Sequence, residues 1–162
     1  MQAGDNEAFA VLYAATVRGL YAFLYPYFRN RADTEDALHT VYLRVKRYCG
    51  NYRAHTDARA WLLQVAKNHA LNELRRRRRE CPLDESAPIP ARPEPSEGLA
   101  FAALNAALNE SEREVVVMHV LWGYKHREIA AAEGIPLGTV TSRYKTAIGK
   151  MRAYIEKEER HA

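Results

Sequence analysis

The chain has 162 residues, of which 48% are hydrophobic, and a formal net charge of +4. That length fits one domain or two small ones and excludes a large multi-domain enzyme, and the apolar share excludes a chain that is disordered throughout. The longest apolar run, Leu20 to Phe28, has nine residues, whereas a bilayer span needs about 20, so we expect neither a transmembrane helix nor, from the first seven residues, a signal peptide.

Residues 1–80 are predicted to form a bundle of three or four helices, because apolar residues recur there at three- and four-residue spacing. Asp5, then Asp33 or Thr34, then Asp57 can cap successive helices, with breaks near Asn30 and at 49–51. The third helix runs into the arginines 75–79. The apolar residues at this spacing are Phe9, Leu12 and Tyr13, then Leu38, Val41, Tyr42 and Val45, then Trp61, Leu62, Val65, Ala66 and Leu74.

Residues 81–98 hold five of the seven prolines. Because proline lacks an amide donor and biases its predecessor away from the helix, this stretch is predicted to be an extended linker between two folded units. An ordered surface loop is the alternative, which the length of the stretch disfavours. The expected fold is therefore all-α, with two small helical domains at 1–80 and 99–162 joined by the linker 81–98.

The second unit is predicted to hold one helix with Leu99 and Leu104, and another that Ser111 and Glu114 can begin as a capping box. A third helix is expected over 125–133, then a break at 134–136 and a last helix over about 138–158. Small units such as these are marginally stable alone. The first helix is indicated by Leu99, Phe101, Leu104 and Leu108, and the expected inward residues of the later helices are Val115, Met118 and Leu121, then Val140, Tyr144, Ile148 and Met151.

Charge is distributed unevenly along the chain. Residues 1–80 carry +6, residues 81–98 carry −3 and residues 99–162 carry +1, but within the last segment residues 136–155 hold four cations and no acid. Two separate cationic stretches predict a polyanionic partner that is contacted at two places.

Residues 126–140 have the pattern of a helix-turn-helix. Ile129 and Ala130 permit close helix crossing, and Gly134 supplies the left-handed backbone that a sharp turn needs. An antiparallel helix pair with a solvated face is the alternative, but the twenty acid-free residues favour DNA. Hydroxyl and cationic groups can bond phosphates and base edges. The predicted DNA-facing residues are Thr139, Thr141, Ser142, Arg143, Lys145, Thr146 and Lys150.

Residues 108–116, Gly123, 127–130, 134–140 and 142–143 together resemble region 4 of a bacterial RNA polymerase sigma factor. Residues 4–9 with 12–13, 33–38 with 41–44, and 60–63 with 66–72 and 74–76 resemble successive helices of region 2. The order and the intervening linker resemble the extracytoplasmic-function (ECF) group, which has only these two regions. The sequence departs from the family pattern at His39, Thr40, Lys125 and Thr141, where other side chains are usual.

The resemblance implies that region 4 reads the upstream promoter element as duplex, while region 2 binds core polymerase and captures unpaired bases of the downstream element. Cationic groups can follow phosphates, and aromatic or amide groups can stack on or bond to bases. The downstream-element candidates are Arg53, His55, Lys67, Asn68, Arg75 and Arg76. The polymerase-binding candidates are Asp33, Glu35, Asp36, His39, Tyr42 and Leu43. Trp61 is interpreted as core, and Arg78 and Arg79 as a solvated helix end.

The function expected from these patterns is that of an alternative sigma factor: not an enzyme, with no catalytic residues, and with core RNA polymerase and promoter DNA as partners. The resemblance implies an anti-sigma factor as well. No metal is expected, because Cys49 and His55 lack a zinc spacing. We also expect no cofactor, membrane insertion or small-molecule substrate. Two lone cysteines suit a reducing cytoplasm. A stand-alone helix-turn-helix regulator is the first alternative, and an enzyme acting on nucleic acid ranks last.

Overall fold

We describe a computed structural model of the chain, covering residues 6–52, 57–80 and 98–162. These residues form helices and contain no strand, which confirms the all-α prediction. The chain divides into two compact units, one on each side of the segment 81–97, and each unit is described here by itself.

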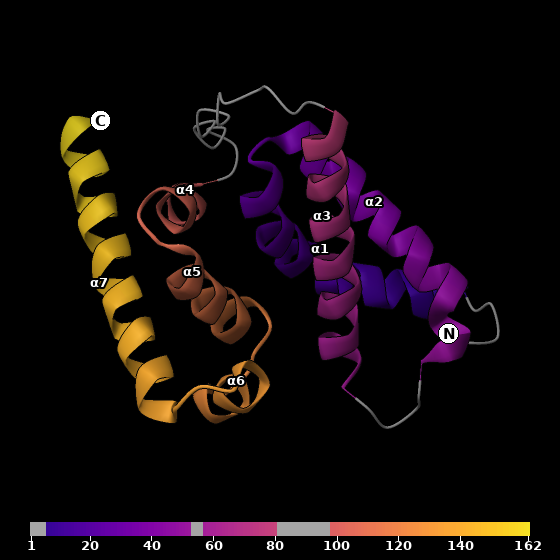
Figure 1. Ribbon diagram of the computed structural model, residues 1–162. Helices are drawn as coiled ribbons and strands as arrows, with labels where there is room; N and C mark the ends of the chain where they lie inside the picture. Colours follow the sequence, from indigo (N-terminus) through magenta and orange to yellow (C-terminus); the bar gives the residue numbers. More distant parts are fainter. Residues whose placement is uncertain (1–5, 53–56, 81–97) are drawn as a thin grey trace. The chain divides into compact units, whose positions relative to one another are not determined.

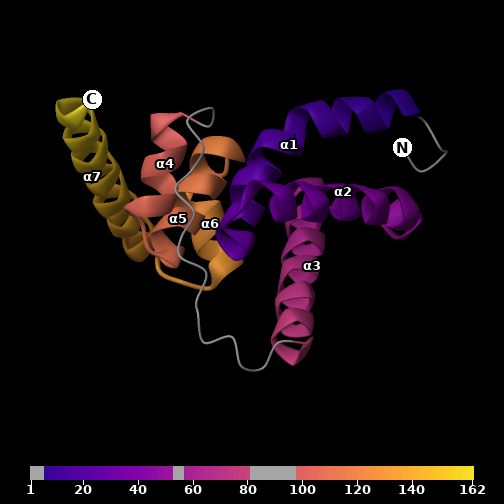
Figure 2. The ribbon, with the colours of Figure 1, turned by 90° about the horizontal axis from the view of Figure 1, so that it is seen from above.

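The N-terminal unit consists of α1 (Asn6–Phe28), α2 (Arg31–Tyr48), the 3₁₀ turn η1 (Cys49–Asn51) and α3 (Ala58–Glu80). The three α-helices contact one another pairwise, and α3 runs across both α1 and α2 (Figures 1 and 2). Leu20 and Leu24 of α1, Val41 and Val45 of α2, and Leu62 of α3 are buried where the helices meet. Burial of these aliphatic side chains supplies the main stabilising term for so small a bundle.

The break between α1 and α2 lies where the sequence predicts it, but the cap does not. Arg29 takes the left-handed conformation (φ 58°) that ends α1, and Asn30 caps α2 by accepting the Asp33 N–H at 2.8 Å. Asp33 is thus the third helical residue, and the prediction of Asp33 or Thr34 as the cap was wrong by three or four positions. Thr34 lies fully buried, with its hydroxyl donating to the Asn30 carbonyl.

By length and apolar composition alone, α1 is able to cross a membrane, and it is the one such helix among the described residues. The sequence analysis expected no such helix, because it counted only uninterrupted apolar runs. Polar residues spaced along α1 interrupt these runs without making the whole helix polar. Core helices of soluble proteins pass the same test. Eight residues of α1, from Thr16 to Phe28, are buried.

The C-terminal unit consists of α4 (Leu99–Ala106), α5 (Glu110–Val116), the π-helical turn η3 (Val117–Leu121), α6 (His126–Glu133) and α7 (Leu137–His161). Helices α4, α5 and α6 all contact α7, which runs along the unit (Figure 1). Val115, Val117, Ile129 and Val140 are fully buried between them. The long last helix therefore provides the surface on which the other three are assembled.

Two sequence predictions for this unit need correction. The capping box of α5 is Asn109 with Glu112, not Ser111 with Glu114. The π-turn η3 winds the chain by about one extra residue per turn, so Leu121 is 43% exposed and Trp122 takes the buried position at 5%. A regular α-helical spacing predicts an inward Leu121, because it does not include the extra residue of the π-helical turn.

Candidate nucleic-acid interface

Helices α6 and α7 form the helix-turn-helix predicted from the sequence. Gly134 ends α6 in the left-handed conformation (φ 65°), and the Ile135 N–H donates to the Ala130 carbonyl at 3.1 Å. A Cβ at Gly134 would meet nothing within 4 Å, so glycine is required by the backbone angle and not by lack of space. Ile129 and Val140, one from each helix, are fully buried and hold the pair together.

Lys125 stands at the N-cap of α6, where its side chain offers no acceptor. The Glu128 carboxylate instead accepts the Lys125 backbone N–H at 2.7 Å. Half of a capping box is therefore present despite the departure at Lys125.

Five of the seven predicted DNA-facing residues form one polar face on the first three turns of α7. Among these residues Arg143 is half-buried, and neither Arg143 nor Lys145 has an ion pair with any described residue. Because α7 has no acid from Leu137 to Ile155, no carboxylate of its own neutralises this face. We name it the α7 face, and its members are Thr139, Ser142, Arg143, Lys145 and Thr146.

The other two predicted residues have polar partners inside the C-terminal unit. Thr141 turns toward α6, with its hydroxyl 3.4 Å from Nδ1 of His126. Lys150 forms an ion pair with Glu112 of α5, at 2.7 Å between Nζ and Oε1. By helical spacing Lys150 follows Arg143 and Thr146 on the same side of α7, and it is exposed, but its charge is already paired within the unit.

A histidine cluster lies behind the α7 face, and the sequence analysis missed it. The rings of His119, His126 and Tyr144 lie within 4.6–5.0 Å of one another, centroid to centroid. Nδ1 of His119 lies 2.7 Å from the Tyr124 carbonyl, so it carries a proton and donates. Nε2 of His126 is buried without a hydrogen-bond partner. Burial, and then the nearby His119, lower the pKa of His126.

Acidification should therefore destabilise the C-terminal unit. Because the pKa of His126 is lower in the folded chain than in the unfolded chain, the folded state binds fewer protons, and its stability falls as the pH drops below about 6.5. Thermal unfolding at pH 7.5 and 5.5 should show a smaller loss for His126→Asn than for the parent chain. The matched control variant is His69→Asn, because burial also lowers the pKa of His69, which belongs to the N-terminal unit. This control should leave the pH dependence of the C-terminal unit unchanged. A full pH effect in the His126 variant would contradict this assignment.

The downstream-element candidates that are described lie along α3. Asn68 is exposed and accepts a hydrogen bond from Gln64 at 3.0 Å, Lys67 is half-buried, and Arg75 is exposed. Arg53 and His55 lie outside the described residues. Trp61 is half-buried, with its ring centroid 5.6 Å from that of Tyr52, which is consistent with its interpretation as a packing residue.

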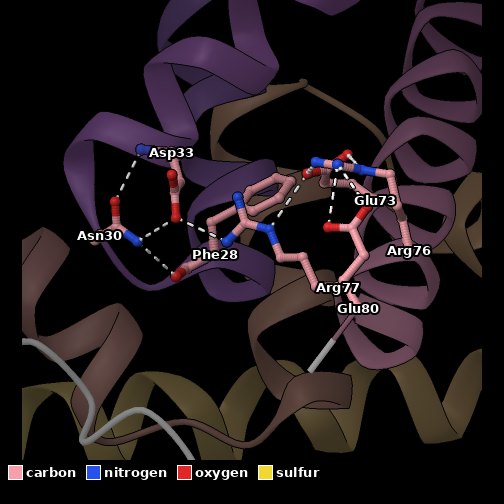
Figure 3. Close-up of polar contacts among 7 residues, drawn as sticks. All are labelled: Phe28, Asn30, Asp33, Glu73, Arg76, Arg77 and Glu80. Carbon is pink, nitrogen blue, oxygen red and sulfur yellow. Dashed lines mark hydrogen bonds and ion pairs between the residues drawn. The ribbon is translucent and has the colours of Figure 1, made fainter. Parts of the chain in front are cut away.

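The arginines at the end of α3 differ in their partners (Figure 3). Arg76 pairs with Glu73 at 2.6 Å and with Glu80 at 3.0 Å. Arg77 reaches back to Asp33 at 2.8 Å and to Glu73 at 3.3 Å. Its guanidinium also lies over the Phe28 ring, 5.5 Å from the centroid. Arg77 thus connects the end of α3 to the α1–α2 turn.

The hydrogen bond from Arg77, followed by that from Asn30, holds the pKa of Asp33 below its ordinary value. The exposure of both side chains limits what this ion pair adds to stability. Asp33 is nevertheless engaged within its own unit, by its cap and by Arg77, before any partner binds.

The polymerase-binding candidates on α2 separate into exposed and buried residues. Asp36 and His39 are exposed and Leu43 is 54% exposed, while Glu35 pairs with Arg31 at 2.7 Å. Tyr42 is only 4% exposed. Its hydroxyl lies 2.8 Å from that of Thr16, which donates to the Leu12 carbonyl, so Tyr42 is the donor. Tyr42 therefore faces α1 and the core, as its place among the apolar residues of this helix predicts, and its assignment to polymerase binding stays a prediction.

Within the described residues, no three His, Cys, Asp or Glu side chains lie close enough together to hold a metal ion. What the two units present is a helix-turn-helix with a cationic face and a bundle with exposed polar residues on α2 and α3. These features define a helical DNA-binding protein.

Comparisons with known proteins identify the family. The family model for sigma-70 region 2 matches residues 12–80, and that for sigma-70 region 4 matches residues 99–151. The RNA polymerase sigma factor CarQ of Myxococcus xanthus is 32% identical, over 92% of this chain and 90% of its own length. The ECF RNA polymerase sigma factor SigM of Mycobacterium tuberculosis is 30% identical, over 87% of this chain and 74% of its own.

Solved structures share the fold. The sigma factor RpoE of Bartonella quintana, in complex with the anti-sigma factor NepR, matches with a TM-score of 0.71 and 20% identity over 93% of this chain and 98% of that one. CnrH, in complex with the cytosolic domain of CnrY, matches with a TM-score of 0.62 and 22% identity over 96% and 92%. The chain belongs to the ECF group of RNA polymerase sigma factors, DNA-binding proteins that direct promoter recognition and transcription initiation.

Proposed function

We propose that the two units divide promoter recognition between them. The segment 99–162 reads the upstream element as duplex DNA, the segment 1–80 binds core polymerase and captures the melted downstream element, and 81–98 links the two. The observation that carries this proposal is the α7 face, which a helix-turn-helix presents without any paired carboxylate. A recognition helix of this kind fits the major groove, and Arg143 has the chemistry to bond a guanine edge.

In the N-terminal unit the proposal assigns Lys67, Asn68 and Arg75 of α3 to the downstream element. Their cationic and amide groups can contact phosphates and unstacked bases, and a base that also stacks on an aromatic side chain gains about 1–3 kcal/mol, comparable with the cost of flipping it out. Capture can therefore hold the duplex open without an energy-consuming step.

We assign the exposed residues of α2 to the core polymerase. The surface of Asp36, His39 and Leu43 combines a carboxylate, an imidazole and a 54%-exposed leucine. An exposed apolar side chain with polar residues beside it is typical of a protein-binding surface. In this proposal the chain is not itself an enzyme and acts in the cytoplasm, where polymerase and chromosome are.

The proposal includes control by an anti-sigma factor. RpoE of Bartonella quintana is seen with the anti-sigma factor NepR, and CnrH with the cytosolic domain of CnrY. These two chains share the fold of this one, which supports, for this chain, a partner that covers polymerase-binding or DNA-binding surfaces.

Transcription in vitro tests the proposed function. Core polymerase with the purified chain should produce transcripts from a subset of genomic fragments that core polymerase alone leaves silent, and the chain should co-purify with core subunits. The double variant Leu43→Asp with His39→Ala should lose core binding, whereas Arg160→Ala at the end of α7 should behave as the parent. A folded chain that yields no promoter-directed transcript from any genomic fragment would overturn the proposal.

A further inference from the structure

Glu112 makes two contacts that join different helices of the C-terminal unit. It is the third residue of α5 and only 6% exposed. One carboxylate oxygen, Oε2, accepts the Asn109 backbone N–H at 3.1 Å and closes the cap of α5. The other, Oε1, accepts a hydrogen bond from Nζ of Lys150 on α7 at 2.7 Å. One side chain therefore caps α5 and holds α7.

Lys150 matches this carboxylate in charge and in reach. A buried carboxylate is costly unless a cation and hydrogen bonds compensate for lost water, and here both are present. The hydrogen bond from Lys150 is the largest cause of the lowered pKa of Glu112. The neighbouring Arg113 donates to the backbone carbonyls of Leu104 and Leu108, at 3.2 and 2.8 Å.

We infer that Lys150 is a positioning residue, which fixes the recognition helix α7 on α5 through Glu112 and does not bind a DNA phosphate. Thr146, the last member of the α7 face, precedes Lys150 by a little more than one helical turn. Loss of the contact between Lys150 and Glu112 would therefore alter the angle at which the α7 face enters the major groove of the DNA. The DNA part of this inference rests on the proposed function, whereas its structural part does not.

Thermal unfolding tests the structural part. In a Trp61→Phe background, Trp122 is the one remaining tryptophan and reports on the C-terminal unit of the full chain. Lys150→Met keeps the apolar stem but leaves a buried carboxylate unpaired, so the Tm should fall by roughly 5–10 °C. The double variant Glu112→Gln with Lys150→Met removes that charge, so its Tm should be higher than that of Lys150→Met alone. Equal Tm values for parent and Lys150→Met would overturn the inference.

The pH dependence gives a second structural readout. The pKa of Glu112 is lowered in the parent chain, so the stability contributed by this pair is present above about pH 4.5 and is lost as the pH falls through the folded pKa. Without Lys150 that pKa should rise, and the Tm gap between parent and Lys150→Met should shrink between pH 7 and pH 4. A gap that stays constant over this range would count against an ionic anchor.

Binding of the holoenzyme to a fragment that it transcribes tests the DNA part. Lys145→Met should reduce the slope of log affinity against log salt by about one, as expected for a lost phosphate contact, whereas Lys150→Met should leave the slope unchanged. Glu112→Gln should weaken binding, although removing a negative charge would by electrostatics alone strengthen it. A slope reduced by about one in Lys150→Met, or tighter binding by Glu112→Gln, would make Lys150 a phosphate ligand and overturn the inference.

The two proposals fail in distinguishable ways. If the holoenzyme binds no promoter fragment, the proposed function falls, and the Tm values of the parent and the two variants still decide whether Lys150 anchors α7.

Discussion

Replacing Ile129 by alanine should strongly destabilise the C-terminal unit while the N-terminal unit keeps its stability. Ile129 is fully buried between α6 and α7, and truncation of such a residue costs about 2–5 kcal/mol because the cavity collapses only partly. A unit of this size has a total stability of about 3–10 kcal/mol at the usual stability per residue. The substitution therefore removes a large part of what holds the helix-turn-helix together.

Trp122 fluorescence in the Trp61→Phe background measures this loss directly. Leu137→Ala is the matched control, because Leu137 belongs to the same motif but is 51% exposed, and it should change the Tm little. The Ile129 variant should also lose promoter-directed transcription while still co-purifying with core polymerase through α2. Parent-like unfolding of Ile129→Ala would mean that the motif is held together by other contacts.

Replacing Arg143 by alanine should lower promoter binding by about 5- to 150-fold, the range that corresponds to about 1–3 kcal/mol for a well-placed arginine on guanine. Arg143 has no ion pair with a described residue, so its truncation leaves no protein carboxylate unpaired and should spare the fold. Affinity of the holoenzyme for a promoter fragment, measured at fixed salt, checks this prediction.

Arg160→Ala removes the same charge from the same helix, nearly five turns beyond Arg143, and should bind as the parent does. A base contact predicts that Arg143→Ala loses discrimination between the promoter and a fragment altered in its upstream element. If the variant binds both fragments more weakly by the same factor, Arg143 contacts phosphate and carries no sequence information.

The fold class and the helix-turn-helix were predictable from the sequence because each depends on local patterns. Apolar spacing gives the helices, and Gly134, with Ile129 and Val140 on either side, marks a turn between two helices that cross closely. The cap positions were less predictable. Asn30 and Asn109 each precede another residue able to cap, within two to four positions, and local sequence does not show which one begins the helix.

The site residues whose contacts the sequence did not show are those whose partners are far away in the chain. Tyr42 meets Thr16, 26 residues earlier, and Lys150 meets Glu112, 38 residues earlier. A cation on a polar helix face and one that holds a buried carboxylate have the same appearance in sequence. The histidine cluster was missed for a related reason, because η3 places His119 on His126 through a turn that no spacing rule describes.

The ion pairs at the end of α3 affect how strongly this part of the chain binds a polyanion. Glu73, Glu80 and Asp33 surround the guanidinium groups of Arg76 and Arg77, so three carboxylates face two cations. These two arginines already have protein counterions, so they neutralise fewer DNA phosphates and release fewer of the counterions that are condensed on the DNA. The effective charge that residues 75–79 offer to DNA is therefore smaller than the five arginines of the sequence indicate. It comes mainly from Arg75, Arg78 and Arg79.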